Sequence, residues 1–202
     1  MGECGEKLSG ALRLDPAKLR IELGDEVFIR PVIENDLEAV LWLVQANYDH
    51  LKTFMEWAKP DYAYEDAKEW IDRSVRGAAS GEVLNFAILH GDRLIGTIGF
   101  ASFDHDARAT EIGYWVDRSE QGKGIISRAC RELLELAFGD IGMNRVQIRC
   151  ASGNLRSAAV PERFRFQKEG VQREHVMRDG KIYDFWIYGL LRNEWRSRNS
   201  TE

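Results

Sequence analysis

The sequence has few cysteines, few prolines and no long apolar run. Its three cysteines, Cys4, Cys130 and Cys150, have neither metal-ligand nor redox-pair spacing, so no metal site is expected. No segment approaches the roughly 20 apolar residues that a membrane-spanning helix needs, and residues 1–12 lack the apolar centre of a signal peptide. These absences argue against a membrane protein and predict a cytoplasmic one with reduced thiols.

An excess of positive charge is also missing. Lys and Arg number 28 against 33 Asp and Glu, which gives a net charge of −5. Without a basic stripe, no nucleic-acid partner is expected. An acidic surface would suit a cationic amine substrate, although mild acidity for solubility explains the same composition. The apolar content of 44% and the charged content of 30% are typical of a soluble globular protein.

The length of 202 residues suits a single domain with a substantial core. We expect residues 1–24 to be a loosely ordered leader, 25–196 the domain and 197–202 a tail. Periodicity predicts strands over 27–31, 85–89, 93–104, 108–117, 145–151, 171–178 and 181–190, and helices over 34–51, 64–78, 126–138 and 155–164. This alternation predicts an α/β fold with a mixed sheet and helices on both faces.

The most informative segment is Glu120-Gln121-Gly122-Lys123-Gly124-Ile125-Ile126, between an expected strand and an amphipathic helix. Two glycines at a helix start leave backbone N–H groups exposed, and the helix dipole favours a bound anion there. The segment lacks the spacing of nucleoside triphosphate and dinucleotide loops. An ordinary strand-to-helix turn is the alternative. We interpret it as the pyrophosphate cradle of an acyl-coenzyme A enzyme.

Several short motifs follow one another in a recognisable order. They are Ile112-Gly113-Tyr114-Trp115, Gln121-Gly122-Lys123-Gly124-Ile125, Asn144-Arg145-Val146, Arg149-Cys150-Ala151, Asn154, Ser157 and Val160-Pro161-Glu162-Arg163. This order resembles the GCN5-related N-acetyltransferases (GNAT), and within them the RimJ/RimL-like ribosomal-protein N-terminal acetyltransferases. The resemblance is dense over residues 95–195. It implies a twisted, mostly antiparallel sheet, acetyl-CoA as cofactor and a homodimer.

The resemblance also implies which residues bind the cofactor. It assigns this role to Tyr114, Trp115, Val116, Gln121, Gly122, Lys123, Gly124, Ile125, Ile126, Asn154 and Ser157. The pantetheine amides need an open strand edge, for which the expected strand must diverge from its neighbour. Asn154 could equally cap the following helix.

The same resemblance implies the catalytic groups. Ser157 matches the position that assists the leaving thiolate, and Glu111 is the candidate base. A backbone N–H near Val116 could stabilise the oxyanion. Glu111 could instead be a cross-strand ion-pair partner. A weak base would suffice for an α-amine, whose pKa of roughly 7.7–8.0 lies well below the value of about 10.4 for lysine. This difference favours an N-terminal substrate.

Aromatic and acidic residues gather around the first two expected helices. They are Trp42, Tyr48, Phe54, Trp57, Tyr62 and Trp70, with Asp49, Glu56 and Asp61 among them. Cation–π attraction would suit a cationic ligand, whereas packing on the sheet explains most of the rings without one. We expect Glu56 and Trp57 to be the substrate contacts.

These observations predict an acetyl-CoA-dependent N-acetyltransferase that acts on a protein N-terminal α-amine by direct attack in a ternary complex. An enzyme for a small amine, such as a polyamine or an aminoglycoside, is one alternative. A non-catalytic acyl-CoA-binding protein is another. Arg165 replaces the glycine that relatives place after the helix, so either it takes a left-handed conformation at a cost of about 1 kcal/mol or the helix ends differently. Pro161 is expected to delay or bend that helix.

Overall fold

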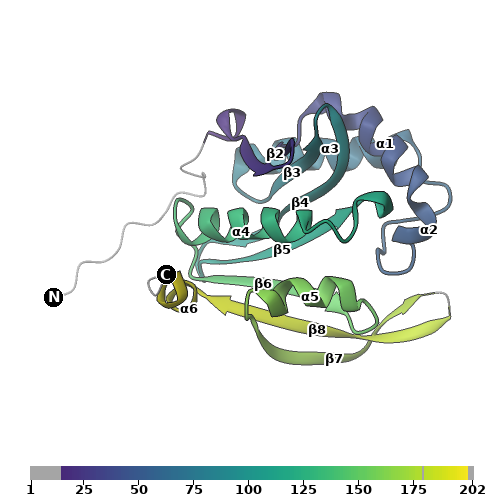
Figure 1. Cartoon of the computed structure of the whole chain (residues 1–202). Coiled ribbons are helices and arrows are strands. Elements are labelled where there is room, and N and C mark those ends of the chain that lie inside the picture. The colour runs from purple at the N-terminus through teal and green to yellow at the C-terminus, as the bar shows by residue number, and fades with distance from the viewer. Residues whose placement is uncertain (1–14, 179, 200–202) are drawn as a thin grey trace.

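The computed structural model describes residues 15–178 and 180–199, which form one eight-stranded sheet (Figure 1). The strand order is β1-β2-β3-β4-β5-β6-β8-β7. The strands are β1 (Ile21–Gly24), β2 (Val27–Pro31), β3 (Leu84–His90), β4 (Arg93–Asp104), β5 (Ala109–Val116), β6 (Arg145–Ala151), β7 (Gln167–Arg178) and β8 (Lys181–Leu191). Neighbours pair antiparallel except β5 and β6, which are parallel. The expected mixed, mostly antiparallel sheet is confirmed.

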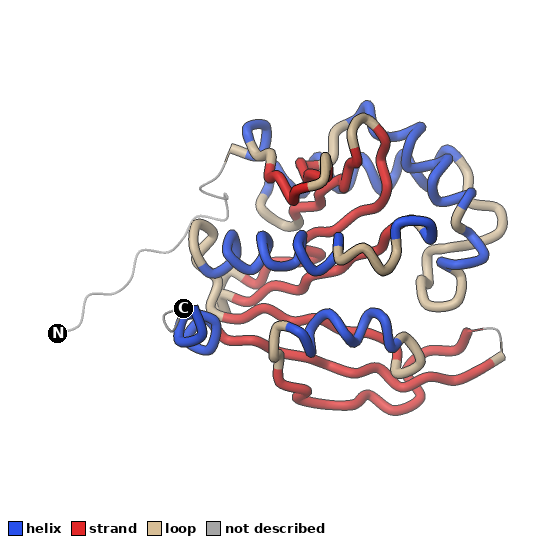
Figure 2. The backbone as a smooth tube through the Cα atoms, viewed as in Figure 1, coloured by secondary structure: helices blue, strands red, loops and turns tan. Residues whose placement is uncertain are grey.

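Helices cover both faces of the sheet. Helices α4 (Ile125–Phe138) and α5 (Leu155–Arg163) lie on the face nearer the viewer in Figures 1 and 2. On the other face, α1 (Leu37–Ala46) and α3 (Tyr64–Ser80) pack together and against β3 and β4. The remaining helices are α2 (Tyr48–Leu51) and α6 (Arg192–Asn199), with short 3-10 turns η1 (Pro16–Lys18), η2 (Glu34–Asp36) and η3 (Arg118–Glu120).

Each face has its own hydrophobic core, because residues of a strand point alternately to the two sides. The larger core buries Phe86, Ile98 and Phe100 of the central strands beneath Leu133 of α4. The smaller core joins Val40, Leu43, Val44, Ala67, Ile71, Ala87 and Leu94 beneath α1 and α3. Strand β5 therefore separates two different environments, which positions the site described below.

Several boundaries differ from the predicted ones. Strand β1 forms within the expected leader and pairs with β2, so the sheet begins before residue 25. The expected helix over 34–51 is interrupted at Asn47, whose side-chain amide donates to the carbonyl oxygen of Leu43 (3.0 Å). Helix α6 was not predicted, and it spans the expected tail boundary. Residues 1–14 of the leader lie outside the described ranges.

At Arg165 the structure has the first of the two expected alternatives. Its φ of 55° is left-handed, and the N–H of Phe166 donates to the carbonyl oxygen of Pro161 (2.9 Å) to close the helix. Arg165 thus takes the conformation that glycine favours, at a cost of about 1 kcal/mol. Pro161 lies inside α5, which nonetheless begins at Leu155.

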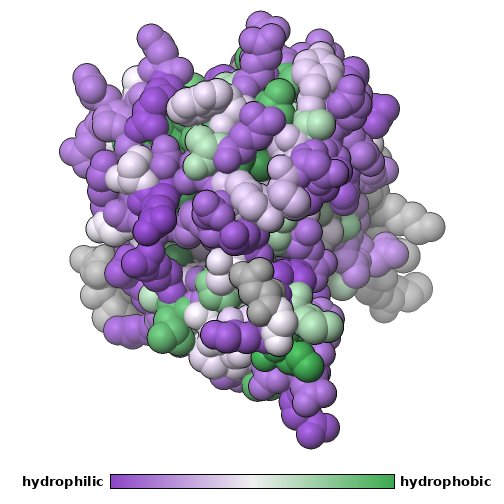
Figure 3. All heavy atoms as spheres, turned by 90° about the vertical axis from the view of Figure 1, so that its right-hand side faces the viewer, coloured by the Kyte–Doolittle hydropathy of each residue, from purple (hydrophilic) through white to green (hydrophobic). Residues whose placement is uncertain are grey.

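The described residues contain no helix that is both long and apolar enough to cross a bilayer. Figure 3 turns the right-hand side of Figure 1 toward the viewer, and this face is mostly hydrophilic with small hydrophobic patches between polar side chains.

Candidate functional site

Strands β5 and β6 begin side by side and then diverge (Figure 1). They pair only over Ala109–Glu111 and Arg145–Gln147, after which β5 continues to Val116 without β6 as a partner. A cavity of about 170 Å³ lies between them, and we call it the slot. Its lining residues are Phe54, Met55, Ile112, Gly113, Tyr114, Ile148, Arg149, Cys150, Ala151, Asn154, Ser157 and Phe185. The divergence that the strand-edge hypothesis requires is therefore present.

The free edge of β5 faces this slot. The N–H of Asp117 donates to the carbonyl oxygen of Ile95 on β4 (2.7 Å). Because hydrogen-bonded and non-hydrogen-bonded pairs alternate in an antiparallel ladder, the N–H groups of Tyr114 and Val116 point away from β4 toward the slot. The main chain of Trp115 faces Thr97 of β4 instead. Tyr114 and Val116 thus turn their backbone N–H groups away from β4, and Tyr114 lines the slot, whereas the main chain of Trp115 is paired with β4.

The glycine loop lies at the start of α4. Gly122 and Gly124 have φ angles of 78° and 73°, and Gly124 caps the helix. A Cβ atom at Gly122 would meet nothing within 4 Å, and one at Gly124 would meet only a guanidinium nitrogen of Arg128 at 3.9 Å. The loop surface is therefore open to a ligand. Ile125 is buried in the core and Ile126 is half-buried, which leaves their N–H groups as the available contacts.

Besides its predicted role in cofactor binding, Lys123 has a structural role. Its ammonium group lies 2.8 Å from a carboxylate oxygen of Glu120, which is only 5% exposed. Arg93 binds the other oxygen at 2.5 Å. The hydrogen bond from Lys123, opposed by burial and reinforced by Arg93, lowers the pKa of Glu120. Lys123 therefore compensates a buried charge as well as bordering the loop.

A polar network that the sequence did not indicate joins the loop to two other elements. The side-chain amide nitrogen of Gln121 lies 2.5 Å from Nε2 of His50 in α2, and Arg156 of α5 donates to the Gln121 oxygen. Burial lowers the pKa of His50, and the charges of Arg118 and Arg156 lower it further. These residues are far apart in the chain, so only the fold brings them together.

Ser157 and Tyr114 are coupled through a proline. Pro161 has no N–H, so it cannot donate to the carbonyl oxygen of Ser157 four residues earlier. The Tyr114 hydroxyl donates to that oxygen instead (2.9 Å), and the Ser157 hydroxyl lies 3.3 Å from the Tyr114 oxygen. Burial raises the pKa of Tyr114, which therefore stays protonated as a donor. Asn154 accepts from the Ser157 N–H (3.1 Å) and so serves as a helix cap while lining the slot.

Glu111, the predicted base, lies where β5 and β6 separate. Its carboxylate forms an ion pair with Arg149 of β6, with Nε 2.9 Å from Oε2. The cross-strand alternative is therefore present in the structure. In the described part of the chain, Glu111 lines neither the slot nor the cavity described next.

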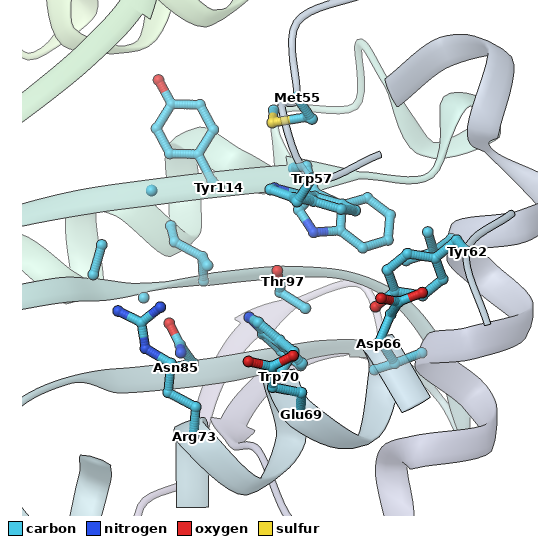
Figure 4. Close-up of a pocket in the computed structure, with 17 residues that line it drawn as sticks. Met55, Trp57, Tyr62, Asp66, Glu69, Trp70, Arg73, Asn85, Thr97 and Tyr114 are labelled. Atoms are coloured by element: carbon cyan, nitrogen blue, oxygen red, sulfur yellow. The ribbon is translucent and has the colours of Figure 1, made fainter. Parts of the chain in front are cut away.

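A second cavity of about 410 Å³ lies on the α1 and α3 face, and we call it the aromatic pocket (Figure 4). Its lining residues are Val40, Val44, Met55, Trp57, Tyr62, Asp66, Glu69, Trp70, Arg73, Asn85, Thr97, Ile98, Gly99, Ala101, Gly113, Tyr114 and Trp115. Asp66 forms an ion pair with Lys59 (2.9 Å). Within the described ranges, the side chains of Glu69 and Arg73 form no hydrogen bond or ion pair, although, beyond the hydrogen bond to Asp66, the charge of Glu69 helps to raise the pKa of Lys59.

The two predicted substrate contacts separate in the structure. The ring of Trp57 packs against those of Tyr62 and Trp115, with centroids 6.2 and 5.9 Å away, and it lines the aromatic pocket. Glu56 does not line it, because its carboxylate points to Arg178 of β7 at 2.7 Å. Trp42 is 66% exposed and lines neither cavity.

Comparison with known proteins agrees with this geometry. The acetyltransferase (GNAT) domain family matches residues 26–167. The "Putative ribosomal N-acetyltransferase YdaF" of Bacillus subtilis (strain 168) is 33% identical over 86% of this chain and 96% of its own. The ribosomal-protein-serine acetyltransferase of Escherichia coli (strain K12) is 29% identical over 85% and 96%. The microcin C7 self-immunity acetyltransferase MccE, solved with acetyl-CoA and AMP, superposes with a TM-score of 0.76 at 27% identity, covering 84% and 94%.

The chain belongs to the GNAT family and is an acetyl-CoA-dependent N-acetyltransferase. Its residues fit that cofactor. Open space above Gly122 and Gly124 leaves room for a pyrophosphate over the N-terminus of α4. The N–H groups of Tyr114 and Val116 offer the strand edge that pantetheine amides need. A cradle and a slot joined in this order suit a long molecule with an anionic end and an amide-bearing arm.

Proposed function

We propose that this acetyltransferase acetylates the α-amine of a peptide or protein N-terminus, and that the acceptor enters through the aromatic pocket. The observation that carries the proposal is the pocket itself, which lies beside β5 and combines Trp57, Trp70 and Trp115 with the carboxylate of Glu69. Aromatic faces and the carboxylate of Glu69 both attract a cation, the form in which an amine arrives, whereas Arg73 in the same pocket opposes one.

When bound, acetyl-CoA supplies a thioester carbonyl carbon to which the amine nitrogen bonds as the carbon–sulfur bond breaks. With the arm paired along the strand edge from Val116, the N–H of Tyr114 would stabilise negative charge that develops on the carbonyl oxygen. The Ser157 hydroxyl donates to the Tyr114 oxygen in the structure (3.3 Å), and it would turn from that oxygen to donate a hydrogen bond to the departing sulfur. Each group stands on the slot side of β5, opposite the entrance for the amine.

The available base favours an acceptor of low pKa. Glu111 would have to break its ion pair with Arg149 to accept a proton from the amine, which makes it a weak candidate for the general base. An α-amine has a pKa of roughly 7.7–8.0 and is partly neutral at pH 7, whereas lysine at about 10.4 is almost wholly charged. A water molecule is then sufficient to take the proton, directly or on to Glu111, which lines neither cavity. Two relatives named for ribosomal-protein acetylation support the same substrate class.

The test is thiol release from acetyl-CoA with a panel of amines. The panel contains a peptide with a free N-terminus, the same peptide blocked at its N-terminus but carrying a free lysine, a polyamine and an aminoglycoside. We expect release with the free N-terminus only. Ser157→Ala should lower kcat at least tenfold, whereas Ser80→Ala, at the end of α3 and outside both cavities, should not change it. Release that requires the lysine or a small amine would contradict the proposal.

A further inference from the structure

The slot and the aromatic pocket are adjoining spaces. Three residues, Met55, Gly113 and Tyr114, line both of them. In Figure 4, Met55 and Tyr114 lie on one side of the pocket, across from Glu69 and Arg73. The two cavities therefore meet at β5, where a reaction between their contents is possible.

Gly113 is the only β5 residue at this junction without a side chain, and neither packing nor backbone geometry explains why. The pairs Asn85–Gly99 and Gly99–Gly113 place these residues in one row on the pocket face. A Cβ atom at Gly99 would come within 2.6 Å of the Asn85 backbone, so packing requires glycine there. A Cβ atom at Gly113 would meet nothing within 4 Å, and its φ is not left-handed. Glycine inside a strand weakens it, and close approach of a ligand is one reason to retain it.

The position of Gly113 in the slot determines which part of a bound cofactor lies near it. Pairing of β5 with β6 ends at Glu111, so the slot closes there, two residues before Gly113. The cradle at Gly122 and Gly124 lies at the other, open end, after β5 has ended. An arm that starts at the cradle and follows the free edge of β5 therefore ends near Gly113. Its reactive end and the acceptor amine would meet across the space that a side chain would fill.

We propose that the space beside Gly113 connects the two cavities, and that the absence of a side chain there determines which acyl groups and amines can react. We call this space the port. This inference rests on the proposed function, because it takes the aromatic pocket as the acceptor site. We therefore expect substitutions at the port to change acyl and amine specificity. A methyl group at position 113 obstructs transfer without touching the cradle or the far side of the pocket, and a wider junction admits longer acyl chains.

The test measures binding and transfer separately. We expect Gly113→Ala to lower kcat/KM for acetyl transfer at least tenfold and Gly113→Val at least a hundredfold. Affinity for coenzyme A by titration calorimetry, and for the acceptor peptide by tryptophan fluorescence, should change less than threefold. The control is Gly170→Ala in β7, another strand glycine without a positive φ, whose Cβ atom would meet only Ile187 at 3.9 Å.

Met55 provides a second route if the Gly113 variants do not fold. Met55→Ala should widen the junction and raise the use of butyryl-CoA relative to acetyl-CoA at least fivefold. Undiminished transfer by Gly113→Val, or an equal loss of coenzyme A affinity and transfer, would overturn the port, as would an unchanged acyl preference in Met55→Ala. Failure of the wild type to acetylate any N-terminus would instead overturn the proposed function, and that result is visible before any variant is made.

Discussion

The two cavities beside β5 are built from different parts of the chain. On the side proposed for the cofactor, the available groups belong to the main chain, namely the loop at Gly122 and Gly124, the start of α4 and the free edge of β5. The aromatic pocket uses side chains from α1, α3, the 52–63 loop and three strands. Main-chain groups recognise what all acyl-coenzyme A molecules share, whereas side chains can differ between relatives without loss of the fold. We therefore expect changes to the loop to abolish cofactor binding and changes to the pocket to alter acceptor choice.

The largest effect is expected at the cradle. Gly122→Glu places a carboxylate where the pyrophosphate is expected, on a residue with a left-handed φ of 78°. Affinity for coenzyme A should fall at least about a hundredfold, equivalent to roughly 2.7 kcal/mol. Calorimetric titration measures it. Gly91→Glu is the matched control, because Gly91 has a φ of 56° and open surroundings in the turn after β3. Equal losses in both variants would mean that backbone strain, not the cradle, is responsible.

A smaller effect is expected in the aromatic pocket, on acceptor binding rather than on coenzyme A binding. Trp57→Ala removes one aromatic wall, so KM for the acceptor should rise about tenfold, or roughly 1.4 kcal/mol. Affinity for coenzyme A should be unchanged. Trp42→Ala removes an exposed tryptophan that lines neither cavity, and its steady-state constants should match the wild type. If Trp57→Ala weakened coenzyme A binding as much as acceptor binding, the separation of the two sites would be contradicted.

The link between Tyr114 and Ser157 should contribute to stability. Tyr114→Phe leaves the Ser157 carbonyl oxygen without its donor and should lower the free energy of unfolding by about 1–2 kcal/mol. Pro161→Ala restores an N–H that can donate to the same oxygen, so the tyrosine hydroxyl should matter less in that background. Urea unfolding of both single variants and the double variant measures the coupling. Additive losses would show that Pro161 does not create the need for Tyr114.

The smallest effect concerns pH. Because burial and two arginines lower the pKa of His50, the folded protein binds fewer protons there than the unfolded chain does. Its contribution to the free energy of unfolding is full above the ordinary pKa of about 6.5 and is lost as pH falls through the folded value. The wild type should thus lose stability relative to His50→Gln between pH 7.5 and 5, in urea unfolding. His90→Gln is the control, and parallel curves for wild type and His50→Gln would exclude this role.

The sequence predicted the cofactor side better than the acceptor side. The loop, the helix after it and the parallel strands are each contiguous, so periodicity and glycine spacing indicate them directly. The left-handed φ of 55° at Arg165 was one of two alternatives that a local substitution left open. Trp115 was assigned to the cofactor by the family resemblance, together with Tyr114 and Val116, and the strand register turns its main chain toward Thr97 of β4.

The acceptor side depends on contacts between distant segments. Trp57 was expected among the substrate contacts and lines the pocket, whereas neighbouring Glu56 is drawn to Arg178 on a strand that only the fold brings near. His50 and Arg156 were missed at the cradle for the same reason. A local feature of the sequence does mark Gly113, because a glycine between Ile112 and Tyr114 interrupts a strand of otherwise bulky residues.

A crystal structure of the protein with coenzyme A would test the division between the two sides most directly. We expect a pyrophosphate over the N–H groups of Gly122 and Gly124, a pantetheine arm along Tyr114 and Val116, and a sulfur atom beside Gly113. The aromatic pocket should remain free for the acceptor. Coenzyme A bound in the aromatic pocket, or a slot left empty at saturating concentration, would contradict it.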